Sequence, residues 1–358
     1  MNIRRIIICL ICLALTSCLC VPVNAEEDIS VSAGSAILIE PNSGKVLYSK
    51  NADKCVQMAS TTKIMSTILT LESGNPDDEF VVDTNAIMVE GSSMGLRPGD
   101  IVTKRMLCYG MMLPSGNDAA NASAVAVSGD IESFVKLMND KAKELGLENT
   151  HFVTPSGLDD DTNEHYSSAY DMAKLTAYAM QNDDFKEICS TKEISFEVGE
   201  ERTVWLSNSN KLLRSYDGCI GVKTGFTDKA GRCLISAVER GGVTLICVTL
   251  NAPNDWQDHT KLYDYGFDKI SVFNVGGIYV NIPGVGGDSD IVTLYAEDEY
   301  LVFPKDENII IEKQIIVPRF VYAPLDNGSI VGRIDYYANN ELVYSAPLIL
   351  LEDFLSAN

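Results

Sequence analysis

Basic residues are scarce in this sequence. Lys and Arg together number 28 against 50 Asp and Glu, which gives a formal net charge of −22. A surface this acidic repels nucleic acid and anionic lipid headgroups. The composition therefore excludes nucleic acid as a partner and favours a soluble, self-repelling surface.

The apolar run near the N-terminus is too short to anchor the chain in a membrane. It extends from Ile6 to Leu15 behind two arginines, whereas a spanning helix needs about 20 apolar residues. This layout is typical of a secretory signal peptide, with cleavage predicted after Ala25. An alternative is the segment "LTSC", which resembles a lipoprotein cleavage box ending at Cys18. Both readings predict an exported protein.

The cysteines that follow residue 25 contain no Cys-x-x-Cys pair. We therefore expect no zinc site and no metal cofactor. An exported protein can form disulfides, but cysteines inside apolar runs are typically small core residues. Both alternatives stay open for the six cysteines, which are Cys55, Cys108, Cys189, Cys219, Cys233 and Cys247.

The order of the predicted elements indicates a mixed α/β (α+β) fold. "SAILIEPNSGKVLYSKN" predicts a β-hairpin, and "GCIGVKTG", "RCLISAVE" and "VTLICVTL" predict three antiparallel strands after a helical middle. We expect one antiparallel sheet in which the first strand pairs with the returning strands and helices cover the sheet. From about Ser271 only short strands are predicted. The predicted division is a signal peptide at 1–25, a larger domain at 26–270 and a small all-β domain at 271–358.

Capping residues mark the starts of three predicted helices. Thr103 begins a helix through Met112, and Asp130 begins one that stops at Gly146. Ser168, with Asp171 in a predicted capping box, begins a helix through residue 180. The segment 60–71 is apolar nearly all round, so a buried helix is predicted there.

The stretch "MASTTKIMST" places Lys63 three residues after Ser60 at the head of that buried helix. Burial lowers the pKa of a lysine, because desolvation disfavours the ammonium form. A neutral amine beside a serine hydroxyl is a competent general base. Taken alone, the spacing also fits an ordinary helix cap followed by a surface lysine.

Two further motifs favour the catalytic reading. "LPSGN" puts Ser115 and Asn117 in a break between two predicted helices, where side chains can point into a cleft. "GVKTGFTDKAG" puts Lys223, Thr224 and Gly225 on a strand that ends in a turn. Lys223 supplies positive charge, Thr224 a hydroxyl for a carboxylate, and Gly225 room for a ligand backbone. The three motifs in this order form a signature of penicillin-binding proteins and β-lactamases.

With these motifs the chain resembles the D-alanyl-D-alanine carboxypeptidases of the low-molecular-weight penicillin-binding proteins, serine peptidase family S11. "LCYGMMLPSGNDAANA", "HYSSAYDMAKL" and "TKLYDYGF" also resemble that family. The resemblance implies that Ser60 is the acylated nucleophile and Lys63 its base. It implies that Ser115 and Asn117 relay protons and hold the substrate amide.

The resemblance assigns the remaining site residues as well. Lys223 and Thr224, followed by Gly225, would receive the terminal carboxylate of the substrate. The oxyanion hole would consist of the backbone N–H groups of Ser60 and Phe226. We therefore expect a wall-associated extracytoplasmic enzyme that trims the terminal D-alanine from peptidoglycan stem pentapeptides. It would need no cofactor, and β-lactam antibiotics would inhibit it covalently.

Three alternatives differ in activity. A β-lactamase or a DD-endopeptidase could use the same scaffold, but the deacylating Glu of class A β-lactamases has only Asp159 in the matching region. A non-catalytic wall-binding protein is the third alternative, and the intact motifs argue against it.

The sequence also departs from the family pattern. Gly116 replaces the aspartate of the Ser-Asp-Asn motif, and Ser156 stands where the family often has His. "LNAPNDWQDHTKL" lacks the arginine with which some members clamp the carboxylate, and no amphipathic anchor helix follows "LILLEDFLSAN". We predict structural roles for the three histidines, which are His151, His165 and His259.

Overall fold

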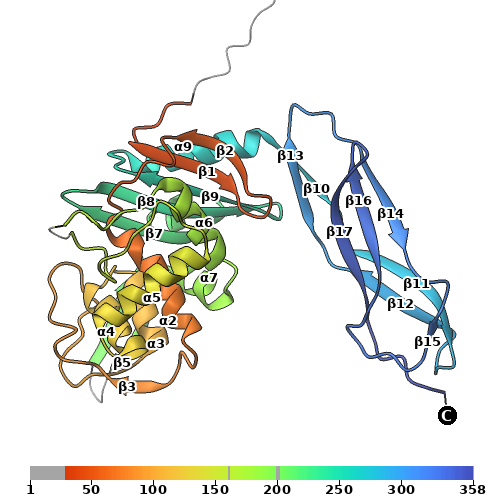
Figure 1. Ribbon diagram of the computed structural model, residues 1–358, viewed down its shortest axis with the longest axis horizontal. Helices are drawn as coiled ribbons and strands as arrows, with labels where there is room; N and C mark the ends of the chain where they lie inside the picture. The colour runs from red at the N-terminus through yellow and green to blue at the C-terminus, as the bar shows by residue number, and fades with distance from the viewer. Residues whose placement is uncertain (1–28, 160–161, 199–201, 358) are drawn as a thin grey trace, which may run out of the picture. The chain divides into compact units, whose positions relative to one another are not determined.

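The computed structural model describes residues 29–159, 162–198 and 202–357 (Figure 1). The predicted cleavage sites at Ala25 and Cys18 lie outside the described residues. Below, "the α/β region" means the described residues up to 268, and "the β region" means residues 270–357. The chain thus has the mixed fold that the sequence predicts, with helices and an antiparallel sheet first and strands after them.

A five-stranded antiparallel sheet organises the α/β region, in the order β2-β1-β9-β8-β7. The predicted pairing of the first strand with the returning strands is confirmed, because Ile37 lies opposite Val248. Strand β7 is an edge, so one side of its backbone has no partner in the sheet. The bounds are β1 (Ser35–Glu40), β2 (Lys45–Lys50), β7 (Cys219–Thr227), β8 (Gly231–Arg240) and β9 (Val243–Leu250).

Helices cover both faces of this sheet, which explains why its central strands are continuous apolar runs. All six residues of β1 are buried. Helix α9 (Asp255–Asp268) packs against β8 and β9, and α6 (Ala169–Ala179) packs against β1 and β9. The remaining helices lie between β2 and β7 in the chain, and most of them are seen below the sheet in Figure 1. They are α2 (Lys63–Glu72), α3 (Lys104–Met112), α4 (Asn117–Ser128), α5 (Ile131–Glu144), α7 (Asp183–Ser190) and α8 (Leu212–Ser215).

Helices α3, α5 and α6 begin at the predicted capping residues Thr103, Asp130 and Ser168. The Thr103 side chain accepts a hydrogen bond from the N–H of Met106 at the start of α3, and Asp130 accepts one from Ser133 at the start of α5. At α6 the capping-box prediction is half right. Ser168 Oγ accepts from the N–H of Asp171. The Asp171 carboxylate is used elsewhere, for the backbone of Asn149 and the hydroxyl of Thr150.

The buried helix predicted at 60–71 is confirmed, with a different beginning. The 3-10 turn η1 (Ala59–Thr62) comes first, and α2 follows from Lys63. Every residue of α2 up to Leu71 is buried. Two short antiparallel strand pairs of this region were not predicted. They are β3 (Glu79–Val81) with β4 (Ile101–Thr103), and β5 (Glu193–Val198) with β6 (Arg202–Ser207).

The β region contains only strands among its described elements, as predicted. Its main sheet has the order β14-β16-β17-β12-β11-β15, and β10 pairs with β13 beside it. Leu294, Ile334 and Leu348 are fully buried in its hydrophobic core. The bounds are β10 (Ile270–Asn274), β11 (Ile278–Val285), β12 (Ile291–Ala296), β13 (Tyr300–Pro304), β14 (Ile311–Ile316), β15 (Val321–Tyr322), β16 (Ile330–Ala338) and β17 (Glu341–Leu350).

The six cysteines of the described residues are free thiols. Four of them are buried, as is typical of small core residues: Cys108, Cys189, Cys233 and Cys247. Within the described ranges, no helix is both long enough and apolar enough to span a bilayer.

Candidate active site

Ser60 lies in η1, the tight turn that leads into α2. Its predecessor Ala59 has φ +49°, a left-handed conformation that L residues other than glycine rarely adopt. Ala59 is buried and Ser60 is half-buried. The turn therefore presents the Ser60 side chain at the surface of an otherwise buried segment.

Lys63 is the first residue of α2 and is fully buried. Its Nζ lies 3.0 Å from Ser60 Oγ, 2.8 Å from Asn117 Oδ1 and 2.6 Å from the carbonyl oxygen of Ser156. The surface-lysine alternative for this residue is therefore wrong. Ser156, which the sequence left without a role, contributes its backbone.

Burial lowers the pKa of Lys63 well below its usual value, because desolvation disfavours the ammonium form. The positive charge of Lys223 lowers this pKa further, and the negative charge of Asp118 opposes both effects. A larger fraction of the amine is therefore neutral at a given pH, and only the neutral form has a lone pair that can accept a proton.

Ser115 and Asn117 lie where α3 ends and α4 begins, as predicted. Ser115 has φ +69° and is buried. A side chain at Gly116 has no room, since a Cβ there would lie 2.7 Å from Asp118 Oδ1 and 2.9 Å from the backbone nitrogen of Met94. This crowding explains why glycine stands at the position where related motifs have aspartate.

Asn117 connects Lys63 to the loop between β3 and β4. Its Oδ1 faces Lys63, and its Nδ2 donates to the carbonyl oxygen of Glu90 at 2.8 Å. The residue is buried. Both ends of the amide are therefore held, which fixes its oxygen toward the lysine.

Asp118 was missed by the sequence analysis. Its buried carboxylate accepts hydrogen bonds from the hydroxyl of Ser93 at 2.6 Å and from the N–H groups of Met94, Gly95 and Leu96 at 2.9 to 3.0 Å. These bonds fix the loop at 93–96 beside Asn117. The only signal in the sequence is an acidic residue in the first turn of α4, where the helix dipole favours negative charge.

Lys223 and Thr224 lie on the edge strand β7. Lys223 is buried, its Nζ donates to the carbonyl oxygen of Thr224 at 2.9 Å, and burial lowers its pKa to about 7. Thr224 is half-buried, and the Phe226 side chain is 62% exposed. Lys223 therefore changes its protonation state near neutral pH.

Gly225 brings β7 against the Ser60 turn. A Cβ on this glycine would lie 3.1 Å from the Ser60 nitrogen and 3.2 Å from Ala59 Cβ. The sequence analysis expected Gly225 to make room for the backbone of a ligand. In the structure, the atoms nearest to a Cβ at this position belong to the Ser60 turn. Two motifs more than 160 residues apart in sequence thus meet.

The three histidines of the described residues lie in separate places and have different contacts. His259 on α9 is fully buried against Ser236 and Thr249 of the sheet, and burial lowers its pKa to about 3. His165 is buried against Thr62 of η1. His151 is bonded to the Glu164 carbonyl. Among the described residues, no group of three His, Cys, Asp or Glu side chains could hold a metal ion.

Models of known protein families match both regions of the chain. The family described as D-alanyl-D-alanine carboxypeptidase matches residues 22–254. The family described as the C-terminal domain of penicillin-binding protein 5 matches residues 267–354.

Individual relatives extend over most of the chain. D-alanyl-D-alanine carboxypeptidase DacF of Bacillus subtilis is 31% identical over 92% of this chain and 88% of its own length. Penicillin-binding protein 5 of Haemophilus influenzae is 28% identical, with a TM-score of 0.66 over 92% of this chain and 99% of that one. A mutant of the Streptomyces K15 DD-transpeptidase is 36% identical, with a TM-score of 0.64 over 67% of this chain and 99% of that one. The chain therefore belongs to the D-alanyl-D-alanine carboxypeptidases, serine-type hydrolases among the penicillin-binding proteins.

Proposed function

We propose that this enzyme removes the terminal D-alanine from peptidoglycan stem pentapeptides through an acyl-enzyme on Ser60. The observation that supports it best is the 3.0 Å separation of Lys63 Nζ and Ser60 Oγ, with Lys63 fully buried. This distance lies within hydrogen-bond reach, as a general base and its nucleophile require.

The contacts of Lys63 also accommodate a neutral amine whose lone pair faces Ser60. A neutral amine has two N–H bonds and one lone pair. Asn117 Oδ1 and the Ser156 carbonyl oxygen can only accept hydrogen bonds from Nζ. These two acceptors use both N–H groups, so the lone pair is left for the hydroxyl proton of Ser60.

The reaction then follows in two steps. Ser60 Oγ transfers its proton to Lys63 Nζ and attacks the carbonyl carbon between the two D-alanines. The backbone N–H groups of Ser60 and Phe226 receive the developing oxyanion. The C–N bond breaks, the leaving amine takes the proton through Ser115, and D-alanine departs. Water then hydrolyses the Ser60 ester, with Lys63 accepting and returning its proton.

Strand β7 supplies the binding side of the proposal. Its outer edge has no strand partner in the sheet, and an extended peptide could add there, the usual way in which a sheet edge takes up a strand. Charged Lys223 and the Thr224 hydroxyl would receive the terminal carboxylate. Since the wall is the substrate, the proposal also requires that the enzyme acts outside the cytoplasm.

Mass spectrometry of a stem pentapeptide incubated with the purified protein tests the activity. We expect the loss of one D-alanine, and an untouched peptide would contradict the proposal. Fluorescent penicillin tests the nucleophile, and Ser60→Ala should abolish covalent labelling. Ser66→Ala is the matched control, because Ser66 is a buried serine of the adjoining helix whose hydroxyl donates to the Pro155 carbonyl.

The same experiments separate the alternative activities. Rapid turnover of penicillin beside an intact pentapeptide would indicate a β-lactamase. Cleavage of cross-linked dimers in preference to pentapeptides would indicate an endopeptidase. A D-amino acid added as acceptor tests for transfer of the acyl group, the activity named for the Streptomyces K15 relative.

A further inference from the structure

We propose that His165, acting through Thr62, positions the Ala59–Ser60 peptide so that the Ser60 N–H points into the oxyanion hole. This inference rests on the proposed function, since it assigns a positioning role for the same reaction. Neither residue carries a catalytic role in the scheme above. Both are buried beside the nucleophile.

A continuous chain of hydrogen bonds connects the imidazole to this peptide. The N–H of Val153 donates to His165 Nδ1 at 2.9 Å. His165 Nε2 lies 2.8 Å from Thr62 Oγ1. Thr62 Oγ1 donates to the carbonyl oxygen of Ala59 at 2.8 Å.

The direction of every bond in this chain follows from its ends. A backbone N–H can only donate, so Nδ1 accepts and the neutral ring carries its hydrogen on Nε2. The Thr62 hydroxyl has one hydrogen, which it gives to the Ala59 carbonyl. The hydroxyl oxygen is then free to accept from His165 Nε2. With these directions, the hydrogen bonds from Val153 to His165, from His165 to Thr62 and from Thr62 to Ala59 can all form together.

The Ala59 carbonyl belongs to the same planar unit as the Ser60 N–H. Because a peptide group is planar and trans, fixing the direction of its C=O fixes the direction of its N–H. A hydrogen bond to the carbonyl also polarises the N–H on the other side of the unit. The Thr62 bond therefore affects both the aim and the strength of the proposed oxyanion donor.

This peptide needs external support. Ala59 has φ +49°, a conformation that persists only where the surroundings impose it. Gly157 closes on the same carbonyl, since a Cβ at that glycine would lie 2.0 Å from the Ala59 oxygen and 2.7 Å from Thr62 Oγ1. The segment that runs from Val153 to Gly157 thus approaches the peptide both directly and through His165.

The test is to remove the two side-chain links and to follow acylation by stopped flow with a chromogenic penicillin. Thr62→Val and His165→Leu should each lower the acylation rate constant by about ten- to a hundredfold, because a misdirected oxyanion donor loses much of its effect. The dissociation constant of the noncovalent complex should not change. Affinity for a boronic acid that forms a tetrahedral adduct on serine should fall in parallel with the rate constant.

Conservative variants and a double variant identify the route. Thr62→Ser retains the hydroxyl and should restore the wild-type rate, and His165→Gln retains a donor near Nε2 and should exceed His165→Leu. The double variant Thr62→Val/His165→Leu should be no slower than Thr62→Val alone, because residues that act in one chain are not additive. Additive losses would show that His165 does not act through Thr62.

Thr70→Val is the matched control for stability. Thr70 is a buried threonine of α2 whose hydroxyl donates to the Ser66 carbonyl, far from the Ala59–Ser60 peptide. It should destabilise the fold and leave the acylation rate of the folded protein unchanged. Wild-type acylation by folded Thr62→Val would overturn this inference and leave the proposed function intact. A wild-type enzyme that is not acylated at Ser60 would instead overturn the proposed function.

Discussion

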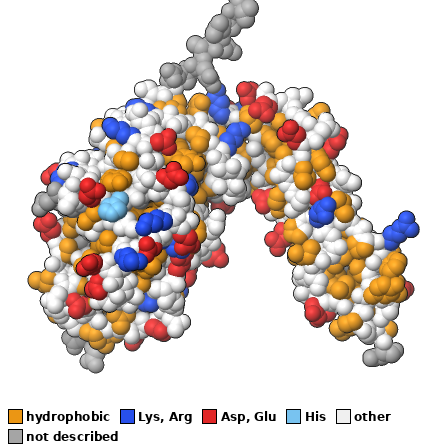
Figure 2. Space-filling view, in the orientation of Figure 1, with side chains coloured by type: hydrophobic (Ala, Val, Ile, Leu, Met, Phe, Trp, Pro, Cys, Tyr) orange, Lys and Arg blue, Asp and Glu red, His pale blue; other side chains and the backbone are white. Residues whose placement is uncertain are grey.

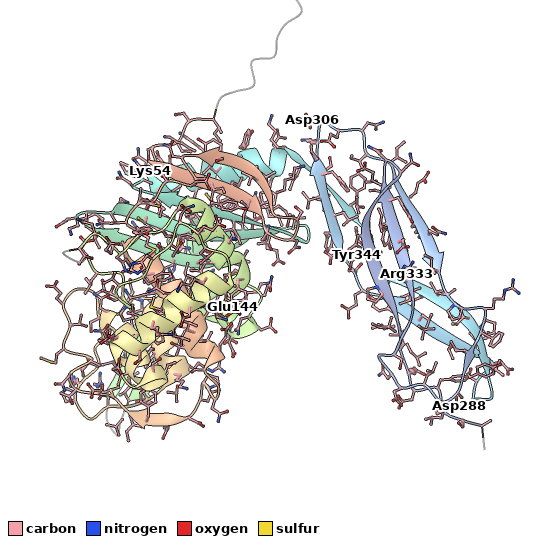
Figure 3. All side chains as sticks on the ribbon, in the orientation of Figure 1. Lys54, Glu144, Asp288, Asp306, Arg333 and Tyr344 are labelled. Atoms are coloured by element: carbon pink, nitrogen blue, oxygen red, sulfur yellow. The ribbon has the colours of Figure 1, made fainter. Side chains whose placement is uncertain are left out.

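The α/β region and the β region differ in what they bury. The α/β region encloses many polar side chains, among them Lys63, Asn117 and Lys223 at the site. Among the described residues after 268, only Asp335 is a buried polar or charged residue. Asp335 is satisfied locally by Arg333, labelled in Figure 3, and by Ser345. Burying polar groups is costly, and those buried in the α/β region include the side chains that are proposed to act on the substrate.

Backbone strain follows the same division. Ala59 and Ser115, with φ +49° and +69°, lie in the site of the α/β region. The residues other than glycine with positive φ in the described β region are Asn339 and Asn340, in the turn between β16 and β17. Asparagine tolerates this conformation in turns. The α/β region also has positive φ at Asn51, Asn75, Asn163 and Asn251, so what sets it apart is this conformation at Ala59 and Ser115, which are not asparagines.

The surfaces differ as well. Figure 2 shows charged side chains of both signs interspersed over the α/β region, whereas hydrophobic side chains gather at the lower end of the β region. In the described β region the buried core is mostly apolar, and its buried titratable side chains are Asp335 and Tyr336. The predictions below test this division, in order of decreasing effect on acylation.

The largest effect is expected for Lys63→Arg. Arginine stays charged with a pKa above about 12 and cannot accept the Ser60 proton. Loss of a general base costs about a hundred- to ten-thousandfold in rate. Acylation by fluorescent penicillin should fall by at least that range, with circular dichroism confirming a folded chain.

Lys136→Arg is the control for this substitution. Lys136 is an exposed lysine of α5 that pairs with Asp140 on the surface. It should acylate at the wild-type rate. Normal acylation of a folded Lys63→Arg protein would mean that another group is the base.

A smaller effect is expected for Thr224→Val, which removes the hydroxyl proposed to receive the substrate carboxylate. A hydrogen bond to a charged group contributes about 1.5–3 kcal/mol, or roughly ten- to a hundredfold in rate. The loss should be seen with a peptide that ends in a free acid and be much smaller with its C-terminal amide. Equal losses for the two peptides would show that another group reads the carboxylate.

The two lysines should affect the pH dependence of kcat/KM in opposite directions. Lys63 acts when neutral, so kcat/KM rises as pH increases through its pKa, which burial and Lys223 hold well below the usual value. Lys223 binds a carboxylate when charged, so kcat/KM for a free-acid peptide should fall as pH increases through about 7. The fall should approach tenfold per pH unit.

Lys223→Arg provides the check on this assignment. Arginine keeps its charge above neutral pH, so the decline of kcat/KM above about 7 should disappear in the variant. A decline that persists in Lys223→Arg would assign it to a different group.

The smallest effect on acylation is expected for Ile334→Ala in the β region. Ile334 is fully buried in the core of that sheet, and truncation of such a side chain costs about 2–5 kcal/mol of stability. Urea unfolding should show this loss, and the acylation rate of the folded protein should remain that of wild type. A reduced rate would show that the β region contributes to the chemistry.

Periodicity and turn signals were sufficient for the main elements. The sheet pairing, the buried α2 and the caps at Thr103 and Asp130 all follow from local sequence rules. Helix α9 and the hairpin of β5 and β6 were not predicted. Helix α9 has buried polar residues such as Asp258 and His259, so its buried side is not a simple apolar stripe.

The site could be predicted from the sequence only where its contacts are local in the chain. Spacing within one helix placed Lys63 beside Ser60. The roles of Asp118 and Ser156 depend on contacts with loops distant in sequence, and the Ser156 contact is made by a backbone carbonyl that its side chain does not encode. The residues 1–28 lie outside the described part of the chain, so the cleavage predictions remain predictions.

The pairing of β1 with β9 has a consequence for the order of events during synthesis. Ile37 on β1 cannot pair with Val248 on β9 until β9 has been synthesised. Strand β9 lies next to β1 in the sheet and is the last strand of that sheet in the chain. At translation rates of about 5–20 residues per second, the wait lasts on the order of 10–40 s. For that time the nascent chain exposes an apolar strand edge, which is prone to aggregation. Truncations before residue 243 lack β9 and leave the edge of β1 without its partner, so they should be insoluble.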